Sequence, residues 1–273
     1  MKLPLTLLAA LPLLLPIPAL GQDFTQLDPT LSYGARIAGG LNYKLSSDLE
    51  LSAEQELRFN SANLFEKSYT TVGAEYKITD FLKVGADYSF IVKNSETETK
   101  LRNRVEGFVT GSVRFGFFKL SLREKLQLTM KGDSTNTFQS PANALSLKSR
   151  LKLEYNAPGA LDPYFSIETR HALNDVSTDG WTYLKNDDNG RYYWWITDPQ
   201  YDFRYMNRIR TTIGTDWKVA KRQKLNLFLV CDYDYSRQID TNREGRVKRS
   251  AGLTVQPSWT FALGVAYTFT IKR

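Results

Sequence analysis

Apolar and polar residues alternate with a period of two over long segments, and this pattern limits the possible folds more than any other feature of the sequence. In segment 82–92, apolar side chains occupy every second position, and Lys83 and Asp87 are among the residues between them. A period of two predicts a β-strand with one apolar face. The same alternation recurs in segments 49–59, 145–155, 224–235 and 259–271.

The length of these segments points to a membrane. Each has about 9 to 13 residues, which is what a tilted strand needs to cross a bilayer, whereas strands average about 5 to 6 residues in soluble domains. We therefore predict an all-β fold, a transmembrane antiparallel β-barrel of about 12 strands within a range of about 10 to 14. The strands are expected near 31–45, 49–59, 68–78, 82–93, 101–114, 118–130, 142–155, 162–173, 205–219, 224–237, 246–255 and 259–271.

Turn signals separate the predicted strands. They include Ser46-Ser47-Asp48, Thr79-Asp80, Asn156-Ala157-Pro158-Gly159 and Gln256-Pro257-Ser258. Bacterial barrels have short periplasmic turns and long external loops, but this strand count makes both the first and the last link short. Either one strand near an end is miscounted, or the long connections face the periplasm.

The amino terminus has the plan of a secretory signal peptide. Lys2 is followed by an apolar run to Leu20, and Gly21 supplies the small residue at the predicted cleavage site before Gln22. The prolines in the run argue against an anchoring helix. We expect residues 1–21 to be removed and residues 22–273 to form one barrel domain in the outer membrane of a Gram-negative bacterium.

The polar face of the predicted strands is densely charged. The residues expected on it are Arg36, Glu54, Glu56, Arg58, Glu75, Lys77, Lys83, Asp87, Arg102, Arg104, Glu106, Arg123, Lys125, Lys148, Arg150, Lys152, Glu168, Arg170, Arg208, Arg210, Asp232 and Asp234. Such groups face water or one another, so we expect them to line the lumen. Two interpretations remain: a salt-bridge lattice that braces the wall, which we favour, and a narrow channel whose basic excess favours anions.

The apolar face carries aromatic residues near strand ends, as in the aromatic girdles of membrane barrels. These residues are Tyr43, Tyr76, Tyr155, Trp217, Tyr235 and Trp259. Glu124 breaks the pattern because it falls on this face, and we expect a β-bulge to turn it inward.

The sequence contains no recognisable catalytic constellation. Barrel lipid hydrolases place a serine two residues after their histidine, but Leu173 has that position relative to His171, the only histidine. Carboxylates at alternate positions, Glu54 with Glu56 and Asp232 with Asp234, have many arginines nearby, which favours ion pairing over acid–base catalysis or a cation site. We expect no enzyme activity, no metal and no cofactor.

Composition excludes two further classes of protein. After removal of residues 1–21, whose only charged residue is Lys2, the chain has 35 lysines and arginines against 29 acidic residues. The net charge of +6 is spread among the alternating segments. No basic patch for nucleic acid is therefore expected. The single cysteine, Cys231, excludes an internal disulfide.

The longest connection, residues 174–204, is rich in aromatic residues, and exposed aromatics are costly unless they pack on something. A lid over the barrel is the favoured interpretation, and a surface that binds a sugar or a peptide is the alternative. The candidate ligand contacts are Trp181, Tyr183, Trp194 and Trp195. In the same connection, Asn186 to Gly190 is expected to be a turn because it lacks the spaced ligands of a calcium loop.

Several strand motifs resemble an uncharacterised outer-membrane β-barrel family, domain of unknown function 2490. They are Glu54-Gln55-Glu56-Leu57-Arg58, Gly73-Ala74-Glu75-Tyr76-Lys77-Ile78, Gly85-Ala86-Asp87-Tyr88 and Tyr205-Met206-Asn207-Arg208-Ile209-Arg210. The resemblance implies the barrel and the outer membrane but no activity and no catalytic residues. The aromatic last strand, with Tyr267 and Phe269, resembles the signal read by the barrel-assembly machinery, so that machinery and outer-membrane lipid are the expected partners.

Three functions follow as hypotheses. The first is a structural or narrow porin-like barrel with an unspecified solute, and the second is a ligand-binding surface barrel that uses segment 174–204. The third is a lipid-modifying hydrolase that would depend on His171. The sequence favours the first.

Overall fold

The computed structural model describes residues 24–61, 64–94, 98–131, 141–156, 158–175, 204–244 and 247–272. The regular structure in this part of the chain consists of strands. They are β1 (Phe24–Gln26), β2 (Thr30–Lys44), β3 (Leu49–Asn60), β4 (Lys67–Lys77), β5 (Leu82–Asn94), β6 (Thr99–Phe115), β7 (Phe118–Lys131), β8 (Asn143–Tyr155), β9 (Leu161–Ala172), β10 (Tyr205–Ala220), β11 (Gln223–Glu244) and β12 (Val247–Lys272). Among the described residues, no helix is long and apolar enough to cross a membrane.

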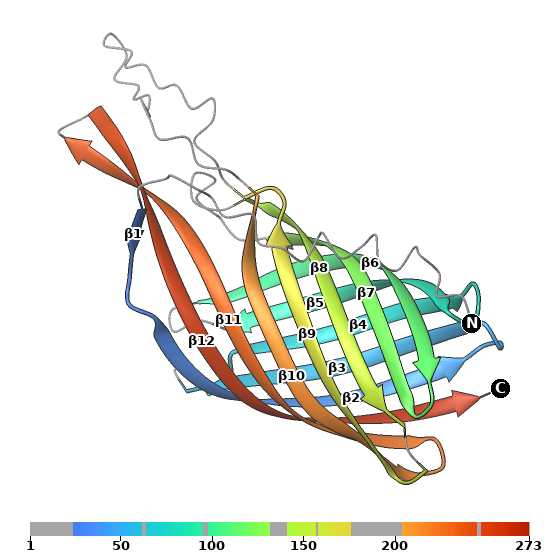
Figure 1. Cartoon of the computed structure of the whole chain (residues 1–273). Helices are drawn as coiled ribbons and strands as arrows, with labels where there is room; N and C mark the ends of the chain where they lie inside the picture. The colour runs from blue at the N-terminus through green and yellow to red at the C-terminus, as the bar shows by residue number, and fades with distance from the viewer. Residues whose placement is uncertain are drawn as a thin grey trace.

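The strands form a closed barrel, which confirms the predicted all-β barrel. Strands β2 to β12 pair in chain order, each antiparallel to the next, and β12 also pairs with β2 (Figure 1). The wall therefore has eleven strands rather than twelve. Because each hairpin reverses the chain direction, an odd number of strands makes the closing pair parallel, with Ser258 beside Thr30 and Lys272 beside Lys44. The short strand β1 also lies parallel to β12.

The difference in strand number comes from one predicted turn. Gln256-Pro257-Ser258 was expected to separate two strands, but β12 runs straight through it. Pro257 pairs with Tyr235 of β11 and lies between the stretch of β12 that pairs with β1 and the stretch that pairs with β2. On that side β12 has no strand neighbour at Pro257, so the residue is tolerated as it is on an edge strand.

The two ends of the barrel differ. The connections β2–β3, β4–β5, β6–β7, β8–β9 and β10–β11 are at one end, here called the turn end, and the carboxyl end of β12 lies there too. The opposite end is called the loop end, and β11 and β12 extend beyond the other strands there (Figure 1). With eleven strands, β2 begins at the loop end and β12 finishes at the turn end, so the two ends of the wall strands lie at opposite ends of the barrel.

Local sequence explains the tight turns. The Ser46 hydroxyl accepts a hydrogen bond from the Leu49 backbone N–H at 3.0 Å, and the Thr79 hydroxyl accepts one from the Leu82 N–H at 3.0 Å. These are side-chain turns of the kind that serine and threonine favour. In the β6–β7 hairpin, Gly116 has a φ of 59°, a conformation that costs glycine little.

The strands are strongly tilted. A path of directly paired residues that starts at Lys44 and crosses every strand in order returns to β2 at Thr30, the other end of the same strand. Such a stagger accompanies strand tilt in closed barrels. Side chains close in space inside the barrel can therefore be far apart along the chain.

The faces of the wall have opposite chemistry. Outward side chains are mostly apolar and exposed, among them Leu263, whose exposed fraction is 68%. The aromatic residues Tyr76, Tyr155, Trp217 and Trp259 are also exposed on the wall. Few apolar side chains of the described residues are buried, and the buried set is instead rich in polar and charged groups. The wall thus carries apolar side chains outside and polar side chains inside.

The expected β-bulge at Glu124 is wrong. The β6–β7 and β7–β8 ladders are continuous there, with Glu124 beside Val109 and Ser149, so its side chain stays on the outer face. The Ser149 hydroxyl donates a hydrogen bond of 2.6 Å to the Glu124 carboxylate. A local partner on the same face therefore takes the place of a bulge.

Three inward aromatic rings cover glycines on neighbouring strands. A Cβ added to Gly85 would overlap the Phe108 ring, one added to Gly264 would overlap the Phe228 ring, and one added to Gly214 would approach the Tyr164 ring at 2.7 Å. Rings packed over glycine bury surface that glycine itself cannot cover and fix the register of the pair.

Candidate functional site in the barrel lumen

The lumen contains cavities at both ends. The largest, here called the turn-end cavity, has a volume of about 990 Å³ and is lined mainly by β2 to β8 and the β10–β11 turn. Beside it, a cavity of about 760 Å³ is lined by β4 to β8. The loop-end cavity is smaller, about 300 Å³. The barrel is thus open to water from its turn end and narrower toward its loop end.

Buried ion pairs join the walls at mid-height. Asp232 of β11 accepts hydrogen bonds from Arg36 Nη2 at 2.9 Å and from Arg210 Nε and Nη2 at 2.5 and 2.7 Å. Arg36 reaches across β12 to make this contact, because its own strand is β2. A carboxylate that binds two guanidinium groups is a strong, directional junction.

A second network spans β4 to β8. Lys125 Nζ lies 3.0 Å from Asp87 and 2.9 Å from Glu106, and Glu106 is also 3.4 Å from Lys148. Closer to the turn end, Glu75 pairs with Lys83 at 2.5 Å and with Arg123 at 3.3 Å. Lysine and arginine side chains therefore reach over intervening strands, as the tilt allows.

Two arginines approach a tyrosine ring inside the lumen. The guanidinium of Arg58 stacks over the Tyr69 ring at 4.4 Å, and that of Arg104 lies 5.6 Å from the same ring. Arg104 lines both the turn-end cavity and the loop-end cavity. Its side chain therefore lies where the two water-accessible spaces meet.

The residues predicted for the lumen occupy the inner face in different ways. Those that line cavities are Arg36, Glu54, Glu56, Arg58, Glu75, Lys77, Lys83, Asp87, Arg102, Arg104, Glu106, Arg123, Lys125, Lys148, Arg150, Lys152, Glu168, Arg170, Arg210 and Asp234. Asp232 is held by Arg36 and Arg210, and Arg208 lies 3.9 Å from Asp234.

The two predicted carboxylate pairs do not act as pairs. Glu56 is ion-paired with Arg58, and Asp232 is held by arginines, as is Asp234, which lies 3.1 Å from Arg170. Glu54 forms no ion pair or side-chain hydrogen bond with the described residues. In the described part of the chain, no group of three or more His, Cys, Asp or Glu side chains is arranged to hold a metal ion.

Other candidates lie elsewhere. His171 is the second-last residue of β9, beside Leu147 and Met206 on the outer face, away from the lumen. The aromatic candidates Trp181, Tyr183, Trp194 and Trp195, and the turn expected at Asn186 to Gly190, lie outside the described residues. Sequence reasoning missed Tyr69 and Phe108, although their place on the polar side of the alternation marks them as inward.

Comparison with known proteins assigns the family but no activity. The family model described as protein of unknown function (DUF2490) matches residues 38–269. The chain belongs to this family. The match covers nearly all of the barrel wall, from β2 to β12, and agrees with the strand motifs quoted from the sequence. No curated protein and no solved structure matches the chain.

Proposed function

We propose that this DUF2490 protein is an integral outer-membrane β-barrel whose lumen is a narrow passage that favours anions. The observation that carries the proposal is the pair of water-accessible cavities on either side of Arg104. A purely structural barrel would need no water-accessible cavities in its lumen, and a wide porin would have no arginine side chain between them.

The outer face supports a membrane location. Exposed leucine, isoleucine, valine and aromatic side chains cover it, and the wall strands have 11 residues or more. About 9 to 11 residues suffice for a tilted strand to cross a bilayer. In water, so large an exposed apolar surface would cause aggregation, whereas lipid covers it.

The charge of the lumen supports anion preference. Twelve lysines and arginines and six acidic residues line the turn-end cavity. The loop-end cavity has five lysines and arginines and two acidic residues. Rings of basic side chains lower the barrier to anions and raise it for cations. The paired residues hold the wall together, and the excess positive charge sets the selectivity.

Single-channel recording of the refolded protein in planar bilayers tests the passage. We expect small, steady openings with a reversal potential that indicates anion preference in a salt gradient. Heat-modifiable migration on gels checks that the barrel has folded and inserted. Folded protein that inserts and never conducts would contradict the channel and leave a purely structural barrel.

The location has its own test. Expression in a Gram-negative host should place the protein in the outer-membrane fraction, and amino-terminal sequencing of that protein should begin at Gln22. Protein found in the soluble periplasmic fraction would contradict the membrane location, whatever the conductance experiment gives.

A further inference from the structure

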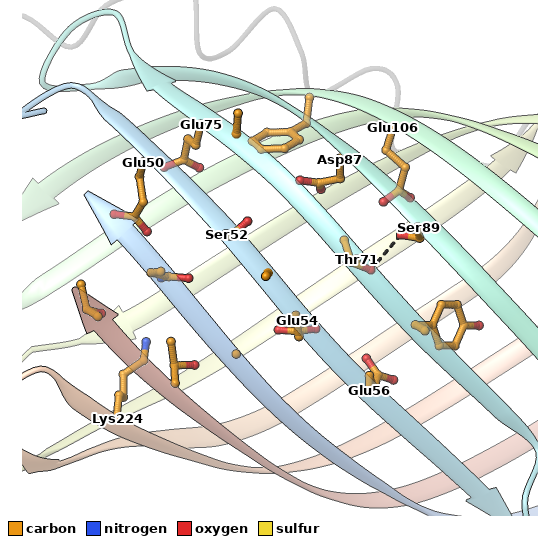
Figure 2. Close-up of a pocket in the computed structure, with 18 of the residues that line it drawn as sticks. Glu50, Ser52, Glu54, Glu56, Thr71, Glu75, Asp87, Ser89, Glu106 and Lys224 are labelled. Carbon is orange, nitrogen blue, oxygen red and sulfur yellow. Dashed lines mark hydrogen bonds between the residues drawn. The ribbon is translucent and has the colours of Figure 1, made fainter. Parts of the chain in front are cut away.

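The acidic side chains that line the turn-end cavity all lie on one of its walls. Its six carboxylates come from four consecutive strands, β3 to β6, and Figure 2 shows them on that wall. They are Glu50, Glu54, Glu56, Glu75, Asp87 and Glu106. Strands β7 to β11 contribute only basic charged side chains to the same cavity. The wall that carries the carboxylates also carries Arg58 and Arg104.

Most charged side chains of the two walls already have partners. Glu56, Glu75, Asp87 and Glu106 are ion-paired, and Glu50 pairs with Lys44 at 3.5 Å. Within the described part of the chain, two charged side chains on wall strands line this cavity without an ion pair or a side-chain hydrogen bond: Glu54 of β3 and Arg150 of β8. Opposite charges of the wall act on them only at longer range: Arg58 and Lys125 on Glu54, and Glu168 on Arg150.

These two residues face each other at one level of the barrel. Glu54 is the sixth residue of β3, which begins at Leu49, and Arg150 is the sixth from the end of β8, which ends at Tyr155. Both strand ends are at the turn end. In the ring of eleven strands, β3 and β8 are five steps apart in one direction and six in the other. Glu54 and Arg150 are therefore on opposite sides of the cavity.

The space between them suits a small molecule. Eleven strands about 4.8 Å apart and tilted by about 40° enclose a backbone diameter of roughly 20 Å. Side chains of glutamate and arginine reaching inward leave a gap on the order of 10 Å between the charged groups. More than one-third of Glu54 is exposed to the cavity.

The side chains that neighbour Glu54 and Arg150 differ in charge. Glu54 is flanked along β3 by Glu56 and Ser52, which also line the cavity. Arg150 is the direct cross-strand neighbour of Arg123 on one side and of Glu168 on the other, and it lines the turn-end cavity and two adjoining ones. A cationic group is thus favoured at the β3 wall and an anionic group at the β8 wall.

We propose that the turn-end cavity binds a zwitterionic solute with its charges at opposite ends, such as a short peptide, whose ammonium group meets Glu54 and whose carboxylate meets Arg150. This inference deepens the proposed function and rests on it, since it names the class of solute that the passage admits. Two ion pairs in one cavity hold such a solute better than either end alone.

Calorimetric titration of the refolded full chain in nonionic detergent tests the inference with three matched probes. Triglycine has both charges, N-acetyltriglycine lacks the ammonium group and triglycinamide lacks the carboxylate. We expect triglycine to bind about tenfold more tightly than either of the others, which corresponds to about 1.4 kcal/mol. Equal affinity for triglycine and N-acetyltriglycine would overturn the proposal and leave an anion site.

Two variants test whether Glu54 binds the ammonium group of the solute and Arg150 its carboxylate. With Glu54→Gln, triglycine should bind no better than N-acetyltriglycine, and with Arg150→Gln no better than triglycinamide. Neither side chain takes part in an ion pair, so both variants are expected to fold, which gel migration checks. Glu50→Gln is the matched control, because its carboxylate is on the same strand and already paired with Lys44, and it should keep the triglycine preference. Loss of the preference in this control alone would overturn the assignment of Glu54.

The outcome of the binding experiment can be distinguished from the outcome of the conductance experiment. Conductance without a preference for triglycine would overturn this inference and leave the anion-favouring passage in place. A preference for triglycine in folded protein that never conducts would support the site and contradict the passage.

Discussion

Arg36 of β2 and Asp232 of β11 are ion-paired at 2.9 Å, although β12 lies between their strands. Both residues are buried, with 8% and 4% of their surface exposed. The contact spans the parallel closing pair, and parallel pairing is slightly less stable per residue than antiparallel pairing. Side chains thus support the closure where the backbone ladder is weaker.

Asp232→Asn should destabilise the barrel, because it leaves Arg36 and Arg210 without their shared counter-charge. Breaking a buried pair typically costs about 3 kcal/mol or more, so we expect a loss of about 3 kcal/mol in the free energy of unfolding. Urea titration in phospholipid vesicles measures it. Asp234→Asn is the control, since that carboxylate is 32% exposed, and it should cost about 1 kcal/mol. Equal losses would show that Asp232 has no special role at the closure.

Arg104→Ala should widen the passage. The side chain lines both cavities, donates a hydrogen bond of 3.2 Å to the Thr129 hydroxyl and lies 5.6 Å from the Tyr69 ring. Its removal should raise single-channel conductance by about twofold or more and weaken anion preference, because both width and positive charge change where the two cavities meet.

The control for Arg104 is Arg114→Ala. Arg114 lines only the cavity near the turn end, among the cavities described, so its loss should leave the conductance unchanged. A rise with Arg114→Ala and none with Arg104→Ala would place the constriction at the turn end instead.

The sequence predicted the wall well and the contacts inside it poorly. The prediction of a strand at 118–130 compares with Phe118–Lys131 in the structure, because alternation and turn residues are local signals. Pro257 misled the strand count, since proline usually marks a turn and its tolerance here depends on where β1 ends and β2 begins. Arg123 pairs with Glu75, 48 positions earlier, through strand tilt, which no local pattern reveals. For the same reason the sequence did not distinguish Glu54 and Arg150 from their paired neighbours.

Glu124 provides a test of the lipid-facing surface. Its carboxylate lies on the outer face, and Ser149, which is fully buried, donates to it. Replacing both members of a polar pair with apolar groups is often neutral or stabilising, so Glu124→Leu with Ser149→Ala should raise the unfolding free energy by about 1 kcal/mol in lipid vesicles. Ser149→Ala alone should lower it. A double variant less stable than the wild type would mean that the carboxylate contributes favourably where it lies.

Gly264 tests the packing of rings over glycine. A Cβ at this position would overlap the Phe228 ring on β11, so Gly264→Ala must displace that ring from the wall. Overpacking of this kind costs about 1–3 kcal/mol, and we expect a loss of that size in the urea titration. Gly39→Ala is the control, because a Cβ there meets no atom within 4 Å, and it should leave stability unchanged or slightly higher.

If the Phe228 ring causes the loss of stability in Gly264→Ala, the effects of changing Gly264 and Phe228 are coupled. In a Phe228→Ala background the added Cβ has no ring to displace, so Gly264→Ala should then cost little, and the interaction energy of the double-mutant cycle should approach the whole single-variant loss. If Gly264→Ala costs the same with and without the Phe228 ring, the loss comes from the β12 backbone beside Arg36, its cross-strand neighbour on β2, rather than from aromatic packing.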